Sequence, residues 1–270
     1  MNTELISSAR NERIRRLLLL QQKSQARRES GLFVVEGRRE LSRCLAAGYQ
    51  AAEVYYCPSS GCSRDFLASE CHLDDALLTE VSPAVYSRIA YRDNTEGVVA
   101  LVHTRPVTLS ELHLGPSPLI VVLESVEKPG NIGAVMRSAD AAGATAVIVC
   151  DPLTDIYNPN LIRASVGAFF AVPCIAASSQ EAIAFLRDNG IQILTAQLQD
   201  SELYYATPMT QPTAIVMGTE STGLTEQWRQ AADRHIRIPM LGIGDSLNVS
   251  VSAAILLFEA VRQRKLKSEE

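Results

Sequence analysis

The chain has 270 residues, of which 47% are hydrophobic and 20% are charged, which is typical of a globular protein with one or two domains. Its formal net charge of -5 argues against a protein that binds polyanions over its whole surface. The first 30 residues, however, carry 7 basic and 3 acidic side chains. This excess indicates either a local contact with phosphates or a solvated amphipathic helix.

The six cysteines show no CxxC spacing, and no His residues complete a zinc pattern with them. We therefore expect buried free thiols in a reducing compartment, and no metal. No apolar run approaches the ~18 residues of a membrane-spanning helix, and the four leucines 17–20 are too few for a signal segment. These features predict a cytoplasmic protein that does not contact membranes.

Residues 1–105 alternate between helical and strand patterns, which predicts a small α/β domain. Helices are expected at 10–29, ending before Gly31, at 38–47, ending before Gly48, and from Ser82-Pro83, where Ser is the N-cap and Pro the first helical residue. Short apolar runs predict strands at 32–35, 52–57 and 97–103.

Residues 106–118 are rich in proline and predict a linker. Beyond it, residues 119–270 predict a second α/β domain. Its expected strands are 119–123, 146–150, 191–196, 214–217 and 236–238, and its expected helices are 131–142, 181–189, 226–232 and 248–264. Continuous apolar strands that alternate with helices are typical of a mostly parallel sheet covered on both faces.

The first motif is Gly130-Asn131-Ile132-Gly133, followed by Arg137 in the same expected helix. Glycines between a strand and a helix permit close backbone approach, and a helix N-terminus favours an anion. The GxGxxG spacing of a dinucleotide-binding protein is absent, which argues against an oxidoreductase with such a cofactor. Arg137 is placed to hold a phosphate; alternatively, it lies on a solvated helix face.

The second motif, Val216–Leu224, turns from a strand through Gly218, Thr219 and Glu220. The glycine would let a ligand approach the backbone, and ligands bind at the carboxyl ends of such strands. Glu220 could equally be a solvated loop acid. The third motif joins Ile238-Pro239-Met240 to Ser246-Leu247-Asn248 before an apolar helix. Capping of that helix would explain either Ser246 or Asn248, but not both.

In this order, the three motifs resemble those of the SpoU family of RNA ribose 2′-O-methyltransferases, over roughly residues 119–264. The segments Leu32–Gly37 and Tyr91–Ala100 resemble the L30e-like substrate-binding domain that often precedes the catalytic domain. They are less specific than the three motifs. The resemblance implies an N-terminal L30e-like α/β domain and a C-terminal α/β trefoil-knot (SPOUT) domain with a mostly parallel sheet. It implies a homodimer formed through the C-terminal domain.

The resemblance also implies S-adenosyl-L-methionine as the cofactor and a set of site residues. The implied catalytic and RNA-facing residues are Asn131, Arg137, Glu220, Ser246 and Asn248. The implied cofactor-binding residues are Met217, Gly218, Ile238, Met240 and Leu247. Basic residues expected to bind RNA in the N-terminal domain are Arg27, Arg28 and Arg92. Glu124 and Lys128 stand where many members of the family have aspartates, which bears on substrate preference.

The expected substrate is structured RNA, and ribosomal RNA, most of all 23S, is favoured over tRNA because the N-terminal domain resembles a ribosomal-protein-like RNA binder. The alternatives are a tRNA 2′-O-methyltransferase and a non-catalytic RNA-binding or ribosome assembly factor on the same scaffold. Because all three motifs lie after residue 119, a chain beginning near residue 106 is expected to dimerise and to bind the cofactor.

Overall fold

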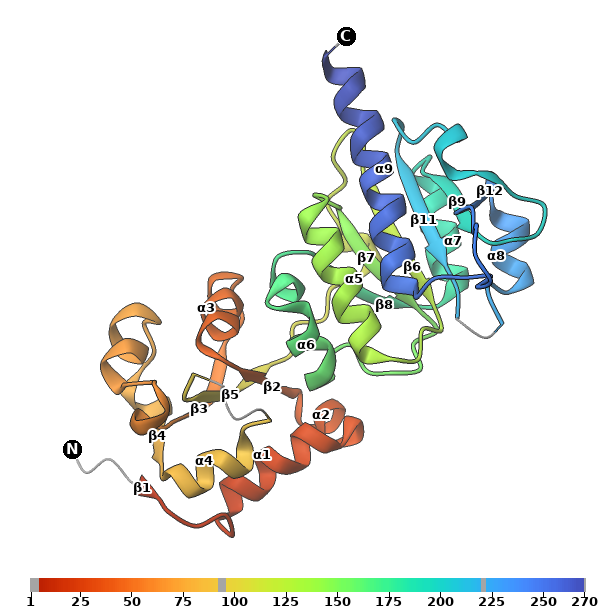
Figure 1. Ribbon diagram of the computed structural model, residues 1–270. Helices are drawn as coiled ribbons and strands as arrows, with labels where there is room; N and C mark the ends of the chain where they lie inside the picture. The colour runs from red at the N-terminus through yellow and green to blue at the C-terminus, as the bar shows by residue number, and fades with distance from the viewer. Residues whose placement is uncertain (1–4, 92–95, 220–221, 270) are drawn as a thin grey trace. The chain divides into compact units, whose positions relative to one another are not determined.

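The computed structural model describes residues 5–91, 96–219 and 222–269. Two compact units make up the chain (Figure 1). The first contains Met1–Arg105 and Tyr157–Phe170, and the second contains Pro106–Ile156 and Ala171–Glu270. Within the described residues, none of the helices is both long enough and apolar enough to cross a membrane.

The first unit is built on a five-stranded mixed sheet with the order β1-β4-β3-β5-β2. β5 pairs antiparallel with both β2 and β3, whereas β4 pairs parallel with β3 and β1. The strand bounds are β1 Leu5–Ile6, β2 Leu32–Glu36, β3 Ala51–Tyr56, β4 Leu78–Val81 and β5 Val98–His103. The strands predicted at 32–35, 52–57 and 97–103 are therefore present, and β1 and β4 add to them.

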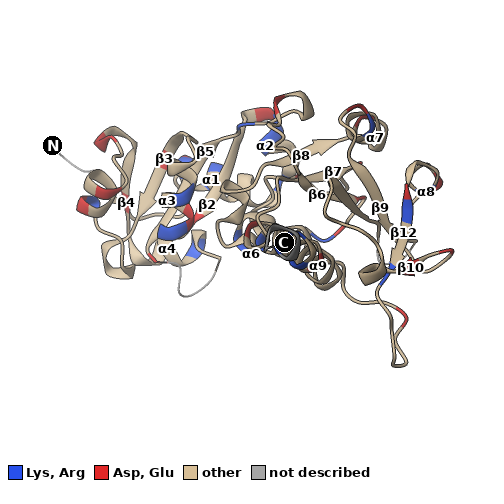
Figure 2. Cartoon of the chain, turned by 90° about the horizontal axis from the view of Figure 1, so that it is seen from above, with Lys and Arg blue, Asp and Glu red and all other residues tan. Residues whose placement is uncertain are grey.

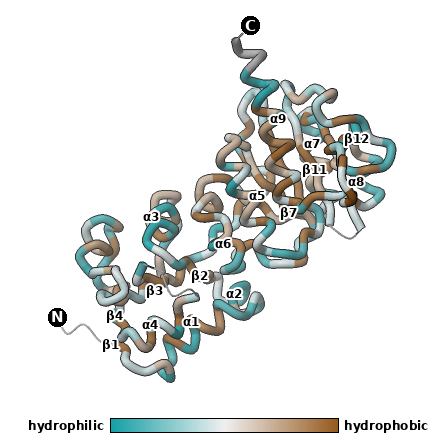
Figure 3. Tube along the Cα trace, viewed as in Figure 1, coloured by the Kyte–Doolittle hydropathy of each residue, from teal (hydrophilic) through white to brown (hydrophobic). Residues whose placement is uncertain are grey.

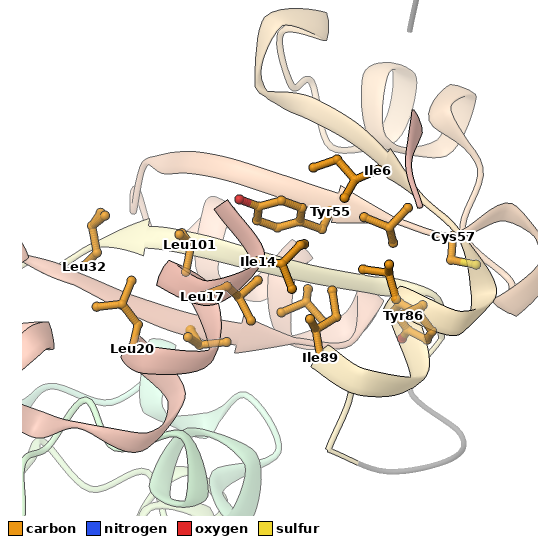
Figure 4. Packing of buried hydrophobic residues seen from close by; sticks show 14 residues of the cluster. Ile6, Ile14, Leu17, Leu20, Leu32, Tyr55, Cys57, Tyr86, Ile89 and Leu101 are labelled. Atoms are coloured by element: carbon orange, nitrogen blue, oxygen red, sulfur yellow. The ribbon is translucent and has the colours of Figure 1, made fainter. Parts of the chain in front are cut away.

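The helices of the first unit are α1 Glu12–Gln22, α2 Ser24–Ser30, α3 Arg38–Ala46, α4 Pro83–Ile89 and α6 Pro159–Ser165. Ser82 caps α4 as predicted, since its hydroxyl accepts from the Val85 N–H at 3.3 Å. In the core, Ile14 and Leu17 of α1 face Tyr55 and Leu101 of the sheet (Figure 4). Burial of this apolar face stabilises the first unit.

The single helix predicted at 10–29 is divided in two at Lys23, whose backbone is extended (φ -114°, ψ 114°). Arg27 explains how the division is stabilised. Its side chain is buried, with 2% exposed, and its Nη1 donates to the carbonyl oxygens of Leu20 at 2.6 Å and Gln21 at 3.4 Å. Arg27 thus satisfies carbonyls at the end of α1. The prediction that Arg27 binds RNA is wrong, because its guanidinium is inaccessible.

The segment Tyr157–Phe170 belongs to the first unit, although it lies between two strands of the second along the chain. Its aromatic rings pack on those of Phe33 and Tyr49, and the Tyr157 hydroxyl accepts from the Arg105 N–H at 3.0 Å. A chain beginning near residue 106 would expose this aromatic surface. We therefore no longer expect such a truncation to leave the rest of the chain intact.

The second unit contains a seven-stranded sheet with the order β10-β12-β9-β11-β6-β7-β8, in which every recorded pairing is parallel. This confirms the expected mostly parallel sheet. The strand bounds are β6 Leu119–Glu124, β7 Ala146–Cys150, β8 Cys174–Ala177, β9 Gln192–Ala196, β10 Glu202–Leu203, β11 Thr213–Met217 and β12 Arg234–Arg237. β8 and β10 were not predicted from the sequence.

Helices cover both faces of this sheet (Figure 1). On one face, α7 Ser179–Asp188 and α8 Glu226–Ala231 contribute Leu186 and Trp228 to a core with inward residues of the strands. On the other face, α5 Pro129–Ala141 and α9 Val249–Glu269 lie against each other and against β7 and β11. Apolar side chains on both faces of β6, β7 and β11 explain why these strands read as continuous apolar runs.

The role of Arg27 predicts a difference between two adjacent arginines. Arg27→Met should lower the free energy of unfolding by about 2 kcal/mol, because buried carbonyls lose a charged donor. Arg28→Met, at an exposed neighbouring position, should change it by about 0.5 kcal/mol or less. Urea unfolding followed by circular dichroism measures both. Equal effects of the two substitutions would contradict the role given to Arg27.

Candidate active site

The three motifs meet because their strands end at the same edge of the parallel sheet. The order β12-β9-β11-β6 places the segments after these four strands next to one another. The first motif follows β6 and forms the start of α5, the second follows β11, and the third follows β12 and leads into α9. Ligands of open α/β sheets bind at this edge.

A large cavity of about 350 Å³ lies among the segments that follow β9, β11 and β12. The structure brings together there all five residues that were predicted to bind the cofactor, Met217, Gly218, Ile238, Met240 and Leu247. The cavity has the size of a small-molecule site and a mixed apolar and polar lining. Apolar side chains suit a flat nucleobase, and the side chains of Gln197 and Arg229 add polar character to the lining. These features fit S-adenosylmethionine.

A small cavity of about 130 Å³ adjoins the large one. The two share Gly218, Thr219 and Val249 in their linings. Asn131 of the first motif and the preceding Lys128 line the small cavity. A ligand group in the large cavity can therefore lie beside a second molecule that enters through the small one.

Asn131 and Asn248 join the first motif to the third. The Asn248 Nδ2 donates to Asn131 Oδ1 at 3.2 Å, across 117 residues of chain. Asn248 also accepts at its Oδ1 from the Ser250 N–H at 3.0 Å, which caps the first turn of α9. Of the two possible caps, Asn248 is the one used, and its other amide end is turned toward Asn131.

The remaining predicted site residues differ in how close they lie to the two cavities. Ser246 lines the large cavity and donates to Asp245 Oδ1 at 3.3 Å. Arg137 is exposed on α5, lines neither cavity, and makes no hydrogen bond or ion pair within the described part of the chain. Glu220 and Arg92 lie outside the described residues. The structure thus unites Asn131 with Asn248 and leaves Arg137 on the nearby helix surface.

Gly218 is needed for the loop itself. A Cβ on Gly218 would lie 2.2 Å from the carbonyl oxygen of Gly223 and 2.6 Å from the nitrogen of Leu224. Thr219 and Gly223 pair as an isolated antiparallel bridge, which folds the loop back on Gly218. We expected Gly218 to leave room for a ligand. The space beside its Cα is instead filled by the returning backbone of its own loop.

Glu124, which the family resemblance connected only with substrate preference, holds the chain beyond the second motif in place. It is buried at the end of β6 and accepts from both the N–H and the hydroxyl of Thr225, at 2.8 and 2.6 Å. The Ser179 hydroxyl accepts from the Trp228 indole at 2.9 Å and donates to Asp151 Oδ2 at 2.5 Å, while Glu124 Oε1 lies 3.4 Å away. Glu124 therefore anchors the chain that follows the second motif. An acid at the end of an apolar strand was the available sequence signal.

All six cysteines are free, and five of them are buried. Burial raises the pKa of Cys174 to about 12 and that of Cys62 to about 11, so both thiols are neutral at physiological pH and are poor nucleophiles. Among the described residues, no group of three or more His, Cys, Asp or Glu side chains is arranged to hold a metal ion.

The contact at Gly218 predicts that its smallest substitution is harmful. Gly218→Ala should lower the free energy of unfolding by about 2 kcal/mol and weaken S-adenosylmethionine binding, because the loop must shift. Gly242→Ala is the control, since nothing lies within 4 Å of its Cβ position. Thermal unfolding and calorimetry measure the two effects. Unchanged stability and binding in Gly218→Ala would show that the loop accommodates the methyl group.

Comparisons with known proteins identify the family of the chain. Residues 118–258 match the SpoU rRNA Methylase family, and residues 11–100 match the MRM3-like substrate binding domain. The 23S rRNA (uridine(2479)-2′-O)-methyltransferase of Streptomyces viridochromogenes is 30% identical over 268 residues, which cover 95% of this chain and 92% of that protein.

Solved structures extend the similarity to the whole fold. A crystal structure of an RNA 2′-O ribose methyltransferase has a TM-score of 0.84 at 39% identity, covering 97% of this chain and 100% of that one. An AdoMet-bound rRNA methyltransferase from Sinorhizobium meliloti has a TM-score of 0.87 at 30% identity, covering 96% and 97%. The chain belongs to the SpoU rRNA methylase family.

Proposed function

We propose that this protein is an S-adenosylmethionine-dependent methyltransferase that methylates a ribose 2′-hydroxyl of 23S ribosomal RNA. The observation that carries the proposal is the Asn248–Asn131 hydrogen bond beside two adjoining cavities. One cavity fits the cofactor, and the other gives a second molecule access to it. The similar protein of Streptomyces viridochromogenes is a 23S rRNA 2′-O-methyltransferase.

Bound S-adenosylmethionine supplies an electrophilic methyl group, and the ribose hydroxyl is the nucleophile. Because no covalent intermediate with the protein is required, the main tasks of the protein are alignment and help with the departing proton. We assign to Asn131 and Asn248 the orientation of the ribose hydroxyl, and to Ser246 the orientation of the loop between the cofactor and the ribose. We assign to Glu220 the task of orienting the Arg137 side chain.

Arg137 is assigned the clamping of an RNA phosphate. Its exposed guanidinium is available to a large substrate, and the guanidinium stays protonated, so it is a poor general base. The planar fork binds a phosphate through two N–H groups, which a lysine cannot reproduce.

The test of the proposed function uses methyl-labelled S-adenosylmethionine with 23S rRNA and, separately, with tRNA. Nuclease digestion and nucleoside analysis should place the label on a ribose 2′-oxygen of 23S rRNA. Label in tRNA instead would show that the substrate is tRNA and not 23S rRNA. Cofactor binding by the protein without transfer to either RNA would favour a non-catalytic RNA-binding or assembly role.

The role of Arg137 separates methyl transfer from cofactor affinity. Arg137→Ala should lower kcat/KM for RNA methylation about 100-fold or more while leaving the Kd of S-adenosylmethionine unchanged. Arg137→Lys should recover little of the loss. The matched control is Arg187→Ala, which removes an exposed arginine from α7 of the same unit. Similar kinetics for Arg137→Ala and Arg187→Ala would contradict the proposal that Arg137 takes part in methyl transfer.

We assign RNA recognition to residues 1–105 and methyl transfer to residues 119–270, with 106–118 as the linker. Lys and Arg residues occur on α1, α2 and α3 of the first unit (Figure 2). Arg13 and Arg16 form ion pairs with Glu53, and Arg27 is buried. Of the seven basic residues among the first 30, the exposed candidates for phosphate contacts are therefore Arg10, Arg15, Lys23 and Arg28. Arg92 remains a proposal from the resemblance alone.

We further propose that the second unit is a knotted domain that forms a homodimer in the cytoplasm. The return of the third motif onto the loop after β11 supports the knot. The free, buried cysteines support a reducing compartment. The dimer is supported by α9, which is largely hydrophobic over its first turns (Figure 3). Val251 and Phe258 lie two turns apart on one face of α9 and are 47% and 48% exposed.

The dimer proposal predicts that a charge on this face separates the subunits. Phe258→Glu should convert the protein to a monomer in sedimentation velocity experiments, because the carboxylate would be buried without a partner. Leu153→Glu is the control, since Leu153 is also a large exposed apolar residue, at 64%. A wild-type monomer, or a dimer that persists in Phe258→Glu, would contradict the assignment of this face.

A further inference from the structure

Tyr91 is the one exposed aromatic side chain among the described residues of the first unit. It follows α4 closely along the chain, and 63% of its surface is accessible. A single exposed ring is common on protein surfaces and does not by itself indicate a site. Tyr91 differs from an incidental surface ring in the way that its neighbours hold it.

Glu36 and Arg163 hold Tyr91 in place. Glu36 Oε1, at the end of β2, accepts from the Tyr91 N–H at 2.7 Å. The other carboxylate oxygen of Glu36 lies 3.5 Å from the Arg163 Nε, and the Arg163 Nη1 donates to Asn160 Oδ1 at 3.1 Å. The side chains of Glu36 and Arg163 are only 7% and 15% exposed. One largely buried carboxylate therefore fixes both the backbone of Tyr91 and the guanidinium beside its ring.

This guanidinium covers one face of the ring. The Arg163 Cζ lies 3.5 Å from the centroid of the Tyr91 ring. At that distance the guanidinium must lie over the face, since an approach in the ring plane would overlap the ring carbon atoms. Because this face is covered while most of the residue is accessible, the accessible area belongs to the opposite face and the ring edge. Tyr91 is thus a fixed, flat surface with one open face.

Exposed cations lie near this open face. Arg88 is on the last turn of α4, three residues before Tyr91. The end of α1 is joined to the same segment, because the Gln21 Nε2 donates to the Ile89 carbonyl oxygen at 2.6 Å, and the exposed Lys23 follows directly. Lys and Arg side chains bind phosphates, whereas aromatic faces bind bases by stacking. The first unit therefore presents together the two kinds of contact that single-stranded RNA uses.

We propose that Tyr91 is a stacking platform for an unpaired nucleobase of the substrate RNA, with Glu36 and Arg163 as its positioning residues. The base stacks on the face opposite Arg163. Every base has a flat π-face, so the platform distinguishes unstacked bases from paired ones and does not read sequence. A ring that is already fixed loses little conformational entropy when a base stacks on it. This inference rests on the proposed function, because it takes ribosomal RNA as the substrate.

The experiment measures methyl transfer by the full chain to protein-free 23S rRNA at several salt concentrations. Tyr91→Ala should raise the KM for the RNA about tenfold, because one stacked base is lost. The kcat and the Kd of S-adenosylmethionine should not change. The slope of log KM against log salt should also stay the same, because no phosphate contact is lost. Tyr91→Phe should keep the wild-type KM, because it keeps the ring.

A long perfect RNA duplex, added as a competitor, should inhibit the wild-type protein and Tyr91→Ala equally, since its bases are paired and stacked. Tyr205→Ala is the matched control, because Tyr205 is a tyrosine of the second unit that is 51% exposed. It should keep the wild-type KM.

A wild-type KM in Tyr91→Ala would overturn the platform and leave the proposed function intact. The same conclusion would follow if Tyr91→Phe or Tyr205→Ala raised the KM as much as Tyr91→Ala does. Weaker inhibition of Tyr91→Ala by the duplex would also overturn the platform, because it would indicate a general contact with RNA. If the folded wild-type protein transfers no methyl group to 23S rRNA, the proposed function fails as well.

Discussion

The second unit depends on parallel strands that end at one edge of its sheet. β6, β11, β9 and β12 are neighbours there, although other elements separate them along the chain. Parallel pairing requires long crossover connections, and these connections bring the segments after each strand to the same edge. The two adjoining cavities and the Asn248–Asn131 contact follow from this arrangement. A change that shifts any of the four strand ends therefore alters the whole site.

Local chain chemistry then holds that edge in shape. The glycine at 218 admits the returning backbone of Gly223, and Glu124 anchors Thr225 just beyond the loop. Asn248 caps α9 with its oxygen and reaches Asn131 with its nitrogen. These contacts stabilise the fold and also position the groups assigned to methyl transfer. Stability and function are consequently coupled at these residues, so variants need a separate measurement of each.

Much of this organisation could be predicted from the sequence. The long apolar strands and capped helices carry local signals, such as Ser82 before Pro83 or the run Leu119–Glu124. The motifs also identified five of the residues that line the large cavity. By contrast, the break at Lys23, the burial of Arg27 and the place of Tyr157–Phe170 depend on contacts formed in the folded chain.

The central claim is that Asn131 and Asn248 act as one unit between the cofactor and the ribose. A double-mutant cycle with Asn131→Ala and Asn248→Ser tests it most directly, because serine keeps an N-cap for α9 but is too short to reach Asn131. Each single substitution should lower kcat/KM for RNA methylation, and the double variant should be little worse than either single variant. If the two losses multiply, the residues act independently and the contact between the first and third motifs has no part in catalysis.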